Sequence, residues 1–338
     1  MTDANLPGGR QRAASLLHLP DLLDDFGTNL AAVLDGTGIT QGDIRPDSFV
    51  PYAAFLAVLD NASRLTGRED LGLLLGKRQT LAALGPLGAV LRHASTLGEA
   101  IGDFVAFQSR NSTGGAVYLL RSDRDVILGY GVYDHSARVS PQIYDLVLAV
   151  GSNLVAELSG GAVTPEEILV TRSAPSDATP YHRLGRCPIR FGQVQTGLVL
   201  RAASLELPLP KADPAQHDLA LARLLEAADG HPLSLAAHVR HVLRPAMLMG
   251  HASMNTLADR LGLHPRTLRR RLRDEGTTFE AIKDGVRRAA AKDLLRLGTL
   301  GVTDIAATLD YATSSAFVQA FRRWEGTTSR LWRAADRR

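Results

Sequence analysis

The chain has 338 residues, of which 45% are hydrophobic and 22% are charged, and its formal net charge is +3. This length predicts two or three domains, each with its own core, in a soluble globular protein. No stretch approaches the ~18 to 20 apolar residues that a bilayer span needs, and residues 1–12 lack the apolar core of a signal peptide. The lone Cys187 excludes an internal disulfide and a Cys-rich zinc site. Together these features favour a cytoplasmic protein.

The first part of the chain mixes helical and strand patterns. Thr96 and Glu99 form a capping-box signature for a helix that buries Phe104. The simplest packing of the predicted elements is an α+β domain with a small antiparallel sheet. The other predicted helices are 52–66, 71–75 and 141–158, and the predicted strands are 116–120, 126–133, 168–171 and 198–200.

A proline-punctuated stretch, 207–214, marks the predicted end of this domain, because it cannot form one continuous helix. A helical pattern resumes over 216–228 as a connector helix or as the edge of the preceding domain. Residues 233–249 then resemble the opening helix of a second domain. The predicted division is therefore 1–207 for the first domain, 208–232 for a linker and connector helix, and 233–338 for the last domain.

Residues 253–333 contain two helix-turn-helix patterns that can be aligned with each other. In each, a first helix buries an Ile/Leu-Ala-x-x-Leu stripe, a tight turn follows, and a second helix buries two apolar residues four positions apart. The buried pair is Leu268 and Leu272 in the first pattern and Phe317 and Phe321 in the second. Pro265 suits the start of a helix. The first turn has Gly262 where positive φ is expected, and the second has Asp310 there.

A long amphipathic helix is predicted between the two patterns. Its apolar residues recur at steps of three and four from Phe279 to Leu297, which places them on one helical face. Such a helix is roughly 28 Å long, close to the ~34 Å that separates successive major-groove faces of B-DNA. The spacing predicts that one monomer places two recognition helices in adjacent major grooves.

Charge is divided unevenly along the chain. Residues 231–338 hold 19 of the 38 Lys and Arg residues but 10 of the 35 Asp and Glu residues, a net charge of +9, whereas the preceding residues carry −6. An arginine run can be a solvated helix face, and Arg is abundant throughout this chain. The separation of a basic, motif-bearing domain from an acidic one instead favours nucleic-acid binding by the last domain.

Residues 250–335 resemble the DNA-binding domain of AraC/XylS-type bacterial transcription regulators. The resemblance rests on Leu-Ala-Asp-Arg-Leu-Gly-Leu-His-Pro-Arg-Thr-Leu-Arg-Arg-Arg-Leu (257–272) and on Ala-Phe-Val-Gln-Ala-Phe-Arg-Arg-Trp-Glu-Gly (316–326). It implies an all-α domain of two helix-turn-helix units joined by a long helix, which binds double-stranded promoter DNA and, in this family, most often activates RNA polymerase. Asp310, Gln319 and Ser329 depart from the residues usual in the family, which are Gly, often Arg, and Pro.

Helical geometry predicts which side chains reach DNA. Arg266, Arg269 and Arg270 are the candidates for base contacts, because arginine bonds guanine O6 and N7 bidentately, and Thr267 lies among them. Arg273 is expected to hold phosphate. In the second unit Gln319 is expected to read adenine, Val318 to contact a thymine methyl group and Arg322 to hold phosphate, and the same face carries Ser314 and Ser315.

The first domain has a looser resemblance, over about residues 30–215, to the N-terminal domain of one branch of AraC-type regulators, often labelled arabinose-binding. It rests on Gly-Pro-Leu-Gly (85–88), Ser-Thr-Leu-Gly-Glu-Ala (95–100) and Cys-Pro-Ile-Arg-Phe-Gly (187–192). The resemblance implies a domain for effector binding or dimerisation, without implying a sugar. The candidate ligand contacts are Phe104, Phe107, Tyr118, Tyr130, Tyr133, His135 and Arg138, although aromatic residues of this kind also form ordinary cores.

Two alternatives to an effector-controlled regulator stay open: a constitutive dimeric DNA binder, and an enzyme fused to a DNA-binding domain. The chain has no Gly-x-Ser-x-Gly elbow and no His-Glu-x-x-His, and the glycines of 72–77 lack the spacing and the Ser/Thr of a phosphate-binding loop. No enzymatic activity, cofactor or metal is therefore expected. The expected partners are promoter DNA, RNA polymerase, a small-molecule effector and a second copy of the chain, without a membrane.

Overall fold

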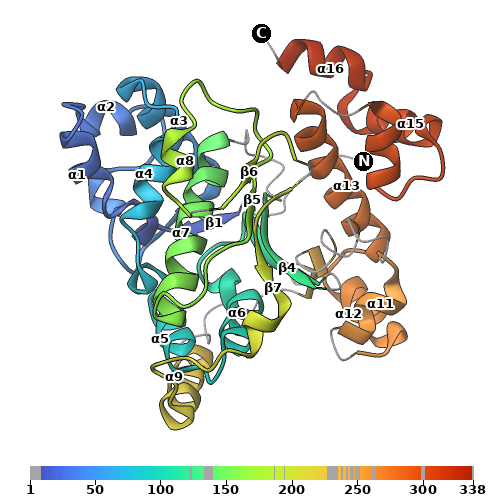
Figure 1. Cartoon of the computed structure of the whole chain (residues 1–338). Coiled ribbons are helices and arrows are strands. Elements are labelled where there is room, and N and C mark those ends of the chain that lie inside the picture. Colours follow the sequence, from blue (N-terminus) through green and yellow to red (C-terminus); the bar gives the residue numbers. More distant parts are fainter. Residues whose placement is uncertain are drawn as a thin grey trace. The chain divides into compact units, whose positions relative to one another are not determined.

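A computed structural model of the chain describes residues 9–121, 124–132, 140–185, 187–193, 195–226, 235–236, 239–240, 243, 247, 252–260, 263–297 and 301–336. The chain divides into two compact units, Met1–His231 and Pro232–Arg338, and each is described by itself (Figure 1). Among the described helices, none combines the length and the apolar character that crossing a membrane requires.

The first unit contains helices, short 3-10 helices and two sheets. The 3-10 helices are η1 (Ala13–Leu16), η2 (Gln41–Asp43), η3 (Leu81–Leu84), η4 (Gln108–Arg110) and η5 (Ala202–Glu206). The α-helices are α1 (Leu19–Asp24), α2 (Leu30–Leu34), α3 (Tyr52–Thr66), α4 (Leu71–Lys77), α5 (Pro86–His93), α6 (Leu97–Phe107), α7 (Pro141–Ser159), α8 (Thr179–His182) and α9 (Pro214–Glu226).

The larger sheet has five strands in the order β3-β4-β7-β5-β6. The strands are β3 (Gly115–Arg121), β4 (Asp125–Val132), β5 (Glu167–Leu169), β6 (Ile189–Arg190) and β7 (Thr196–Arg201), and β1 (Arg10–Arg12) pairs with β2 (Phe49–Pro51) in a second sheet. β3, β4, β7 and β5 are antiparallel, as expected, but β6 runs parallel to β5. The expectation of a wholly antiparallel sheet is therefore wrong at β6, a strand of two residues that has no detectable period in the sequence.

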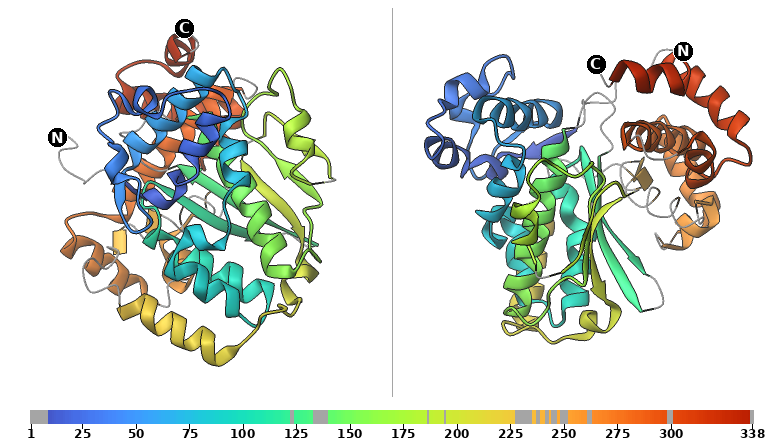
Figure 2. Two further views of the ribbon diagram at one scale, coloured as in Figure 1. Left: turned by 90° about the vertical axis from the view of Figure 1, so that its left-hand side faces the viewer. Right: turned by 45° about the horizontal axis from the view of Figure 1, so that its top comes forward.

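Helix α7 lies on one face of the sheet and contacts α4 (Figure 2). Gly72 and Gly76, four residues apart on α4, make this contact possible. A Cβ atom at Gly72 would overlap the carbonyl oxygen of Gln142, and one at Gly76 would meet that of Leu146. The two glycines thus permit close helix packing, which explains the Gly-x-x-x-Gly spacing without a phosphate-binding loop.

Helix α9 packs against α5 within the first unit. Its buried face includes His217, whose Nε2 lies 2.8 Å from a carboxylate oxygen of Asp103 in α6. Burial alone would lower the pKa of His217, but the hydrogen bond to Asp103 and the nearby acids outweigh burial, so the pKa is raised. A histidine with a raised pKa therefore helps to hold α9 in place.

Every described element of the second unit is helical. The helices are α11 (Met254–Arg260), α12 (Pro265–Asp274), α13 (Phe279–Leu297), α14 (Val302–Thr308), α15 (Ser314–Glu325) and α16 (Ser329–Asp336). The predicted apolar stripes are buried: Leu257 and Ala258 on α11, Leu268 and Leu272 on α12, Phe279, Ile282, Val286, Ala290 and Leu294 on α13, Ile305 and Ala306 on α14, and Phe317 and Phe321 on α15.

Candidate nucleic-acid interface

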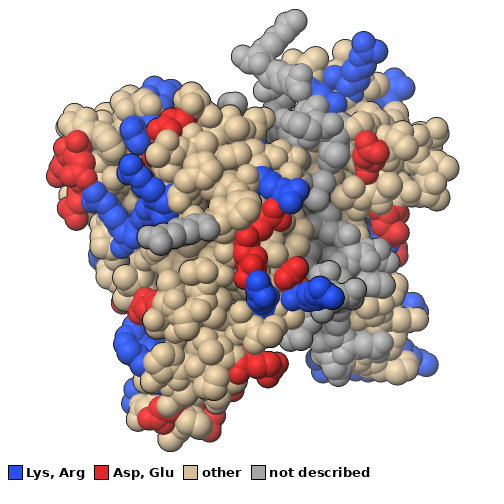
Figure 3. All heavy atoms as spheres, viewed as in Figure 1, with Lys and Arg blue, Asp and Glu red and all other residues tan. Residues whose placement is uncertain are grey.

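Helix α12 separates its apolar and basic side chains on opposite faces. Leu268 and Leu272 are fully buried. Arg266, Arg269, Arg270 and Arg273 are exposed and follow the spacing i, i+3, i+4, i+7, which aligns them along one side of a helix. Thr267 lies half-buried beside this arginine stripe. Figure 3 shows Lys and Arg side chains in blue at the surface of the α11–α12 region.

Both ends of α12, the helix that carries the arginine stripe, are fixed by local features. Pro265 occupies the first turn, as expected, and the His264 side chain caps the helix by accepting the Arg266 N–H through Nδ1 at 3.2 Å. The end of the helix is set by Gly276, which has a φ of 73°. Because both ends have local causes, α12 presents its arginines from a rigid helix of ten residues.

The arginine stripe differs from four cations of α13, Lys283, Arg287, Arg288 and Lys292, in lacking acidic partners among the described residues. Within the described residues, no carboxylate forms an ion pair with any of these four arginines, and Arg269 has a contact of 3.7 Å to the sulfur of Met254. The cations of α13, in contrast, pair internally: Arg288 and Lys292 both bind Glu325. The charge of the stripe is therefore available to an external anion.

Helix α15 carries the second set of candidate residues. Ser314, Ser315, Val318 and Gln319 border a surface hollow of about 340 Å³, together with Val302 and Thr303 of α14. Arg322 is exposed one turn further along α15 and has no acidic partner among the described side chains. Phe317 and Phe321 are buried on the opposite face. Val302 and Thr303 cannot be assigned to this hollow from the sequence, because only the fold brings the start of α14 beside α15.

The Asp310 turn between α14 and α15 is fixed by contacts from α13. Among the described residues, Asp310 is the one residue other than glycine with positive φ, at 59°, as its alignment with Gly262 suggested. Its carboxylate accepts from Lys283 Nζ at 2.9 Å, and Arg287 Nε donates to the carbonyl oxygen of Leu309 at 2.9 Å. The Arg287 guanidinium also lies over the Tyr311 ring, 4.4 Å from its centroid. These contacts compensate for the unfavourable backbone conformation.

Lys283 also contacts the part of the chain that precedes α11. Its Nζ donates to the carbonyl oxygen of Ala252 at 3.0 Å. One side chain on α13 therefore contacts both the segment that leads into α11 and the Asp310 turn between α14 and α15. The relative position of the two helix pairs depends partly on this residue.

An aromatic cluster anchors α15 and α16. The Phe321 ring lies 6.5 Å from that of Trp324 and 6.0 Å from that of Trp332, and burial raises the pKa of Tyr311 in the same cluster to about 12. Burial alone would raise the pKa of Glu325, but hydrogen bonds from Arg288 and Lys292 outweigh it and lower that pKa. Ser329 is buried at the first position of α16, where the family's proline would also fit.

The aromatic candidates of the first unit separate into two groups. Phe104 and Tyr130 line a cavity of about 100 Å³, whereas Phe107 packs against the core and the Tyr118 hydroxyl donates to Gln195 at 3.2 Å. Burial raises the pKa of Tyr130 to about 12, and its hydroxyl lies 2.8 Å from that of Tyr52. The remaining candidates, Tyr133, His135 and Arg138, lie outside the described residues.

Comparison with known proteins agrees with this geometry. Residues 27–209 match the family described as the arabinose-binding domain of AraC transcription regulator, N-terminal, and residues 257–335 match a helix-turn-helix domain. The first match alone covers more than half of the chain. The chain belongs to the AraC family of transcription regulators. It is accordingly a DNA-binding helix-turn-helix regulator, and neither matched family is an enzyme family.

Relatives of this AraC-family protein share nearly its full length. It is 30% identical over 333 residues to the HTH-type transcriptional regulator VirS of Mycobacterium tuberculosis, with 97% of each chain covered. It is 27% identical over 333 residues to the ornithine utilization regulator of Pseudomonas aeruginosa, with 94% of each covered. The crystal structure of the transcriptional regulator CdpR from Pseudomonas aeruginosa aligns with a TM-score of 0.44 and 25% identity, covering 90% of this chain and 96% of CdpR.

Proposed function

We propose that this protein reads promoter DNA through two helix-turn-helix units joined by α13, with α12 and α15 in adjacent major grooves. The observation that carries this proposal is the stripe of four exposed arginines on α12 without acidic partners among the described residues. Arginines in a major groove discriminate guanine by a bidentate contact worth ~1 to 3 kcal/mol per base pair. The residues assigned to bases are Arg266, Thr267, Arg269 and Arg270, and those of α15 are Ser314, Ser315, Val318 and Gln319.

Arg273 and Arg322 are proposed to hold phosphates rather than bases. Both are exposed, and each lies one turn beyond the base-reading candidates of its helix. Phosphate contacts orient a protein on the duplex without selecting a sequence. Loss of either side chain is therefore expected to weaken binding to all sequences to a similar extent.

The division proposed for the chain assigns effector binding, dimerisation or both to residues 1–207. Residues 208–232 would act as linker and connector helix, and residues 233–338 would bind DNA. The acidic first part and the basic last part support this assignment, because only the basic part suits a polyanion. By family resemblance the protein is proposed to activate transcription through RNA polymerase in the cytoplasm. One relative is named as a regulator of ornithine utilization, which supports a small molecule as the controlling signal.

The proposed function is tested by selecting bound fragments from a random duplex library at near-physiological salt. The full chain is expected to enrich a site with two elements about 10 base pairs apart, one for each recognition helix. A variant in which Arg266, Arg269 and Arg270 are replaced by Ala is expected to lose one of the two elements. Enrichment of a single element that survives this triple substitution would contradict the proposal.

A further inference from the structure

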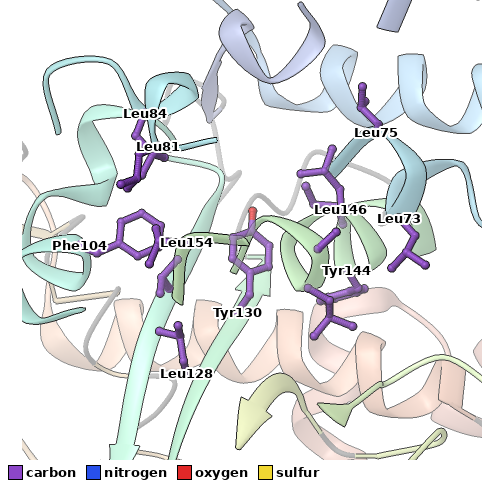
Figure 4. Packing of buried hydrophobic residues seen from close by; sticks show 14 of the residues in the cluster. Leu73, Leu75, Leu81, Leu84, Phe104, Leu128, Tyr130, Tyr144, Leu146 and Leu154 are labelled. Carbon is purple, nitrogen blue, oxygen red and sulfur yellow. The ribbon is translucent and has the colours of Figure 1, made fainter. Parts of the chain in front are cut away.

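The first unit contains a cavity whose walls are mostly apolar. It has a volume of about 100 Å³ and is lined by side chains from several elements, including Phe55, Leu84, Phe104, Leu128, Leu146 and Leu198. Figure 4 shows Phe104 from α6, Leu128 and Tyr130 from β4, and Leu146 from α7 gathered in this region. An engineered apolar cavity of ~150 Å³ binds benzene. The cavity of this protein is smaller, so its volume suits a ligand whose apolar body is smaller than benzene.

Polar residues line the cavity where β1 lies beside the segment that follows α6. Gln11 bridges to Ser112, and the Arg12 N–H donates to the carbonyl oxygen of Asn111 at 2.7 Å. Asn111 and Arg12 both line the cavity. The cavity thus combines a polar patch from two chain segments with the apolar wall formed by α6, α7 and β4.

Two buried polar groups in this patch have no protein partner among the described residues. The Asn111 residue is 7% exposed, and neither atom of its side-chain amide forms a hydrogen bond there. The Nε of Arg12 is also without a partner among the described residues, although Nη2 of the same guanidinium pairs with Asp47. Buried polar groups normally form hydrogen bonds, so these two donors are suited to a ligand.

The Arg12 side chain is held in place by its neighbours. Its guanidinium lies 6.0 Å from the centroid of the Phe49 ring. A Cβ atom at Gly85, where φ is 57°, would come within 2.6 Å of that guanidinium. Gly85 therefore leaves room for the arginine, and the N–H of its Nε is presented by a fixed side chain rather than a flexible one.

We infer that this cavity binds a small carboxylate with a compact apolar body. The carboxylate accepts hydrogen bonds from Arg12 Nε and from the Asn111 amide nitrogen, and a body of about four or five carbons fills the apolar part. The arginine disfavours an amine. A sugar is disfavoured despite the family's name, because most of the wall is apolar, as at Leu84, Leu146 and Leu198, and would leave several sugar hydroxyl groups without hydrogen-bond partners. This inference rests on the proposed sensing role of the first unit.

The test uses the full-length protein and calorimetric titration with 4-methylpentanoate, its amide 4-methylpentanamide, and arabinose. We expect saturable binding of the carboxylate, at least tenfold weaker binding of the amide, and no binding of arabinose. Equal binding of amide and carboxylate would overturn the anionic assignment. Binding of arabinose alone, or of none of the three probes, would overturn the inference.

Two variants separate a specific site from a general effect on folding. Asn111→Leu preserves side-chain size and removes an amide that makes no protein hydrogen bond among the described residues, so it is expected to fold and to bind the carboxylate at least tenfold more weakly. Gly151→Leu fills the cavity from α7, where a Cβ would lie 3.3 Å from Leu198 Cδ1, and is expected to abolish binding. Unchanged affinity in both variants would contradict the site.

Measurement of DNA binding in the same samples distinguishes failure of this inference from failure of the proposed function. A protein that binds DNA sequence-specifically but none of the probes would overturn the cavity assignment alone. A protein that binds the carboxylate but not DNA would contradict the proposed function and leave the cavity assignment intact.

Discussion

At the residue scale, the position of an arginine on its helix matters more than the number of arginines. Helix α12 carries five exposed arginines, but Arg271 lies off the stripe formed by Arg266, Arg269, Arg270 and Arg273. The face opposite the stripe holds Leu268 and Leu272 in the core. A helix with this division can place only the stripe against the floor of a groove.

Arg269→Ala and Arg271→Ala therefore form a matched pair of variants. Arg269→Ala is expected to lose ~1 to 3 kcal/mol of preference at one base pair, whereas Arg271→Ala is expected to keep the parent's preference at every position. Fluorescence anisotropy with duplexes substituted one base pair at a time measures both. If Arg271→Ala changed base preference and Arg269→Ala did not, the assignment of the groove-facing side of α12 would be wrong.

Asp310 supports a second prediction at this scale. Positive φ costs an L-residue roughly 1 to 2 kcal/mol and costs glycine almost nothing. Asp310→Gly loses the contact with Lys283 but relieves this strain, whereas Asp310→Ala loses the contact and keeps the strain. We expect Asp310→Ala to be less stable than Asp310→Gly by about 1 to 2 kcal/mol.

Tryptophan fluorescence during urea unfolding measures this difference, because both tryptophans of the chain, Trp324 and Trp332, lie in the second unit. The pH of the experiment does not affect this comparison, because both variants lack the same carboxylate. Equal stability of the two variants would contradict the role given to backbone strain.

At the element scale, the periodic patterns predicted the helices that carry them. The bounds predicted for the helix 52–66 agree with α3, and those for 141–158 differ from α7 by one residue at its end. The predicted strands 116–120 and 126–133 correspond to the antiparallel pair β3 and β4. The strands β1, β2 and β6 have two or three residues each, which is too short for a period of two to be recognised.

The exposed faces of α12 and α15, which carry the candidate DNA-contacting residues, could likewise be predicted from the sequence. The face of a helix on which a residue lies depends only on its neighbours three and four positions away. The cavity could not be predicted, since Arg12, Asn111 and Leu198 come from segments far apart in the chain. Phe104 and Tyr130 were predicted as ligand contacts on aromatic character alone. Nothing in the sequence distinguishes them from Phe107 and Tyr118, which the fold places elsewhere.

Close packing of α4 on α7 gives a prediction with an internal control. Gly72→Ala would place a methyl group on the carbonyl oxygen of Gln142, so we expect a loss of about 1 to 3 kcal/mol in the stability of the first unit. Gly102 lies within α6 with open space around its Cβ position. Gly102→Ala is therefore expected to add about 0.5 to 1 kcal/mol.

The melting temperatures of the two glycine variants, measured by calorimetry on the full chain, check the pair. A Gly72→Ala protein that melts at or above the parent's temperature would show that α4 and α7 are not in close contact. A Gly102→Ala protein as unstable as Gly72→Ala would show that the instability of Gly72→Ala does not come from the contact between α4 and α7.

The docking of α9 is expected to depend on pH through His217. Its pKa is raised in the folded protein, so protonation stabilises the docked helix. This contribution is fully present below the unfolded pKa of about 6.5 and is lost as pH rises through the folded value. Asp103, Glu99 and Asp218 supply the facing carboxylates.

Amide hydrogen exchange of α9, corrected for intrinsic rates, should show protection that decreases as pH rises above the unfolded pKa of about 6.5. His217→Gln should keep a hydrogen bond to Asp103 but remove this dependence on pH. Protection that increases with pH in the parent, or the same dependence in the variant, would be inconsistent with a protonated histidine at this contact.

At the scale of the whole molecule, the length of α13 matches the spacing of successive major grooves. Helix α13 has 19 residues, which corresponds to about 28 Å and approaches the ~34 Å pitch between major-groove faces. Lys283, on α13, contacts both Ala252 and Asp310. This arrangement suits two recognition helices that bind one side of the duplex as a unit.

Recognition by two coupled helices is tested most directly by the affinity of the full chain for selected sites with altered spacing. Inserting five base pairs between the two elements is expected to turn one element to the opposite side of the duplex and to reduce affinity to that of a single element. Substituting base pairs between the elements, without changing their spacing, should have little effect. Undiminished affinity after the five-base-pair insertion would contradict reading by two coupled helices.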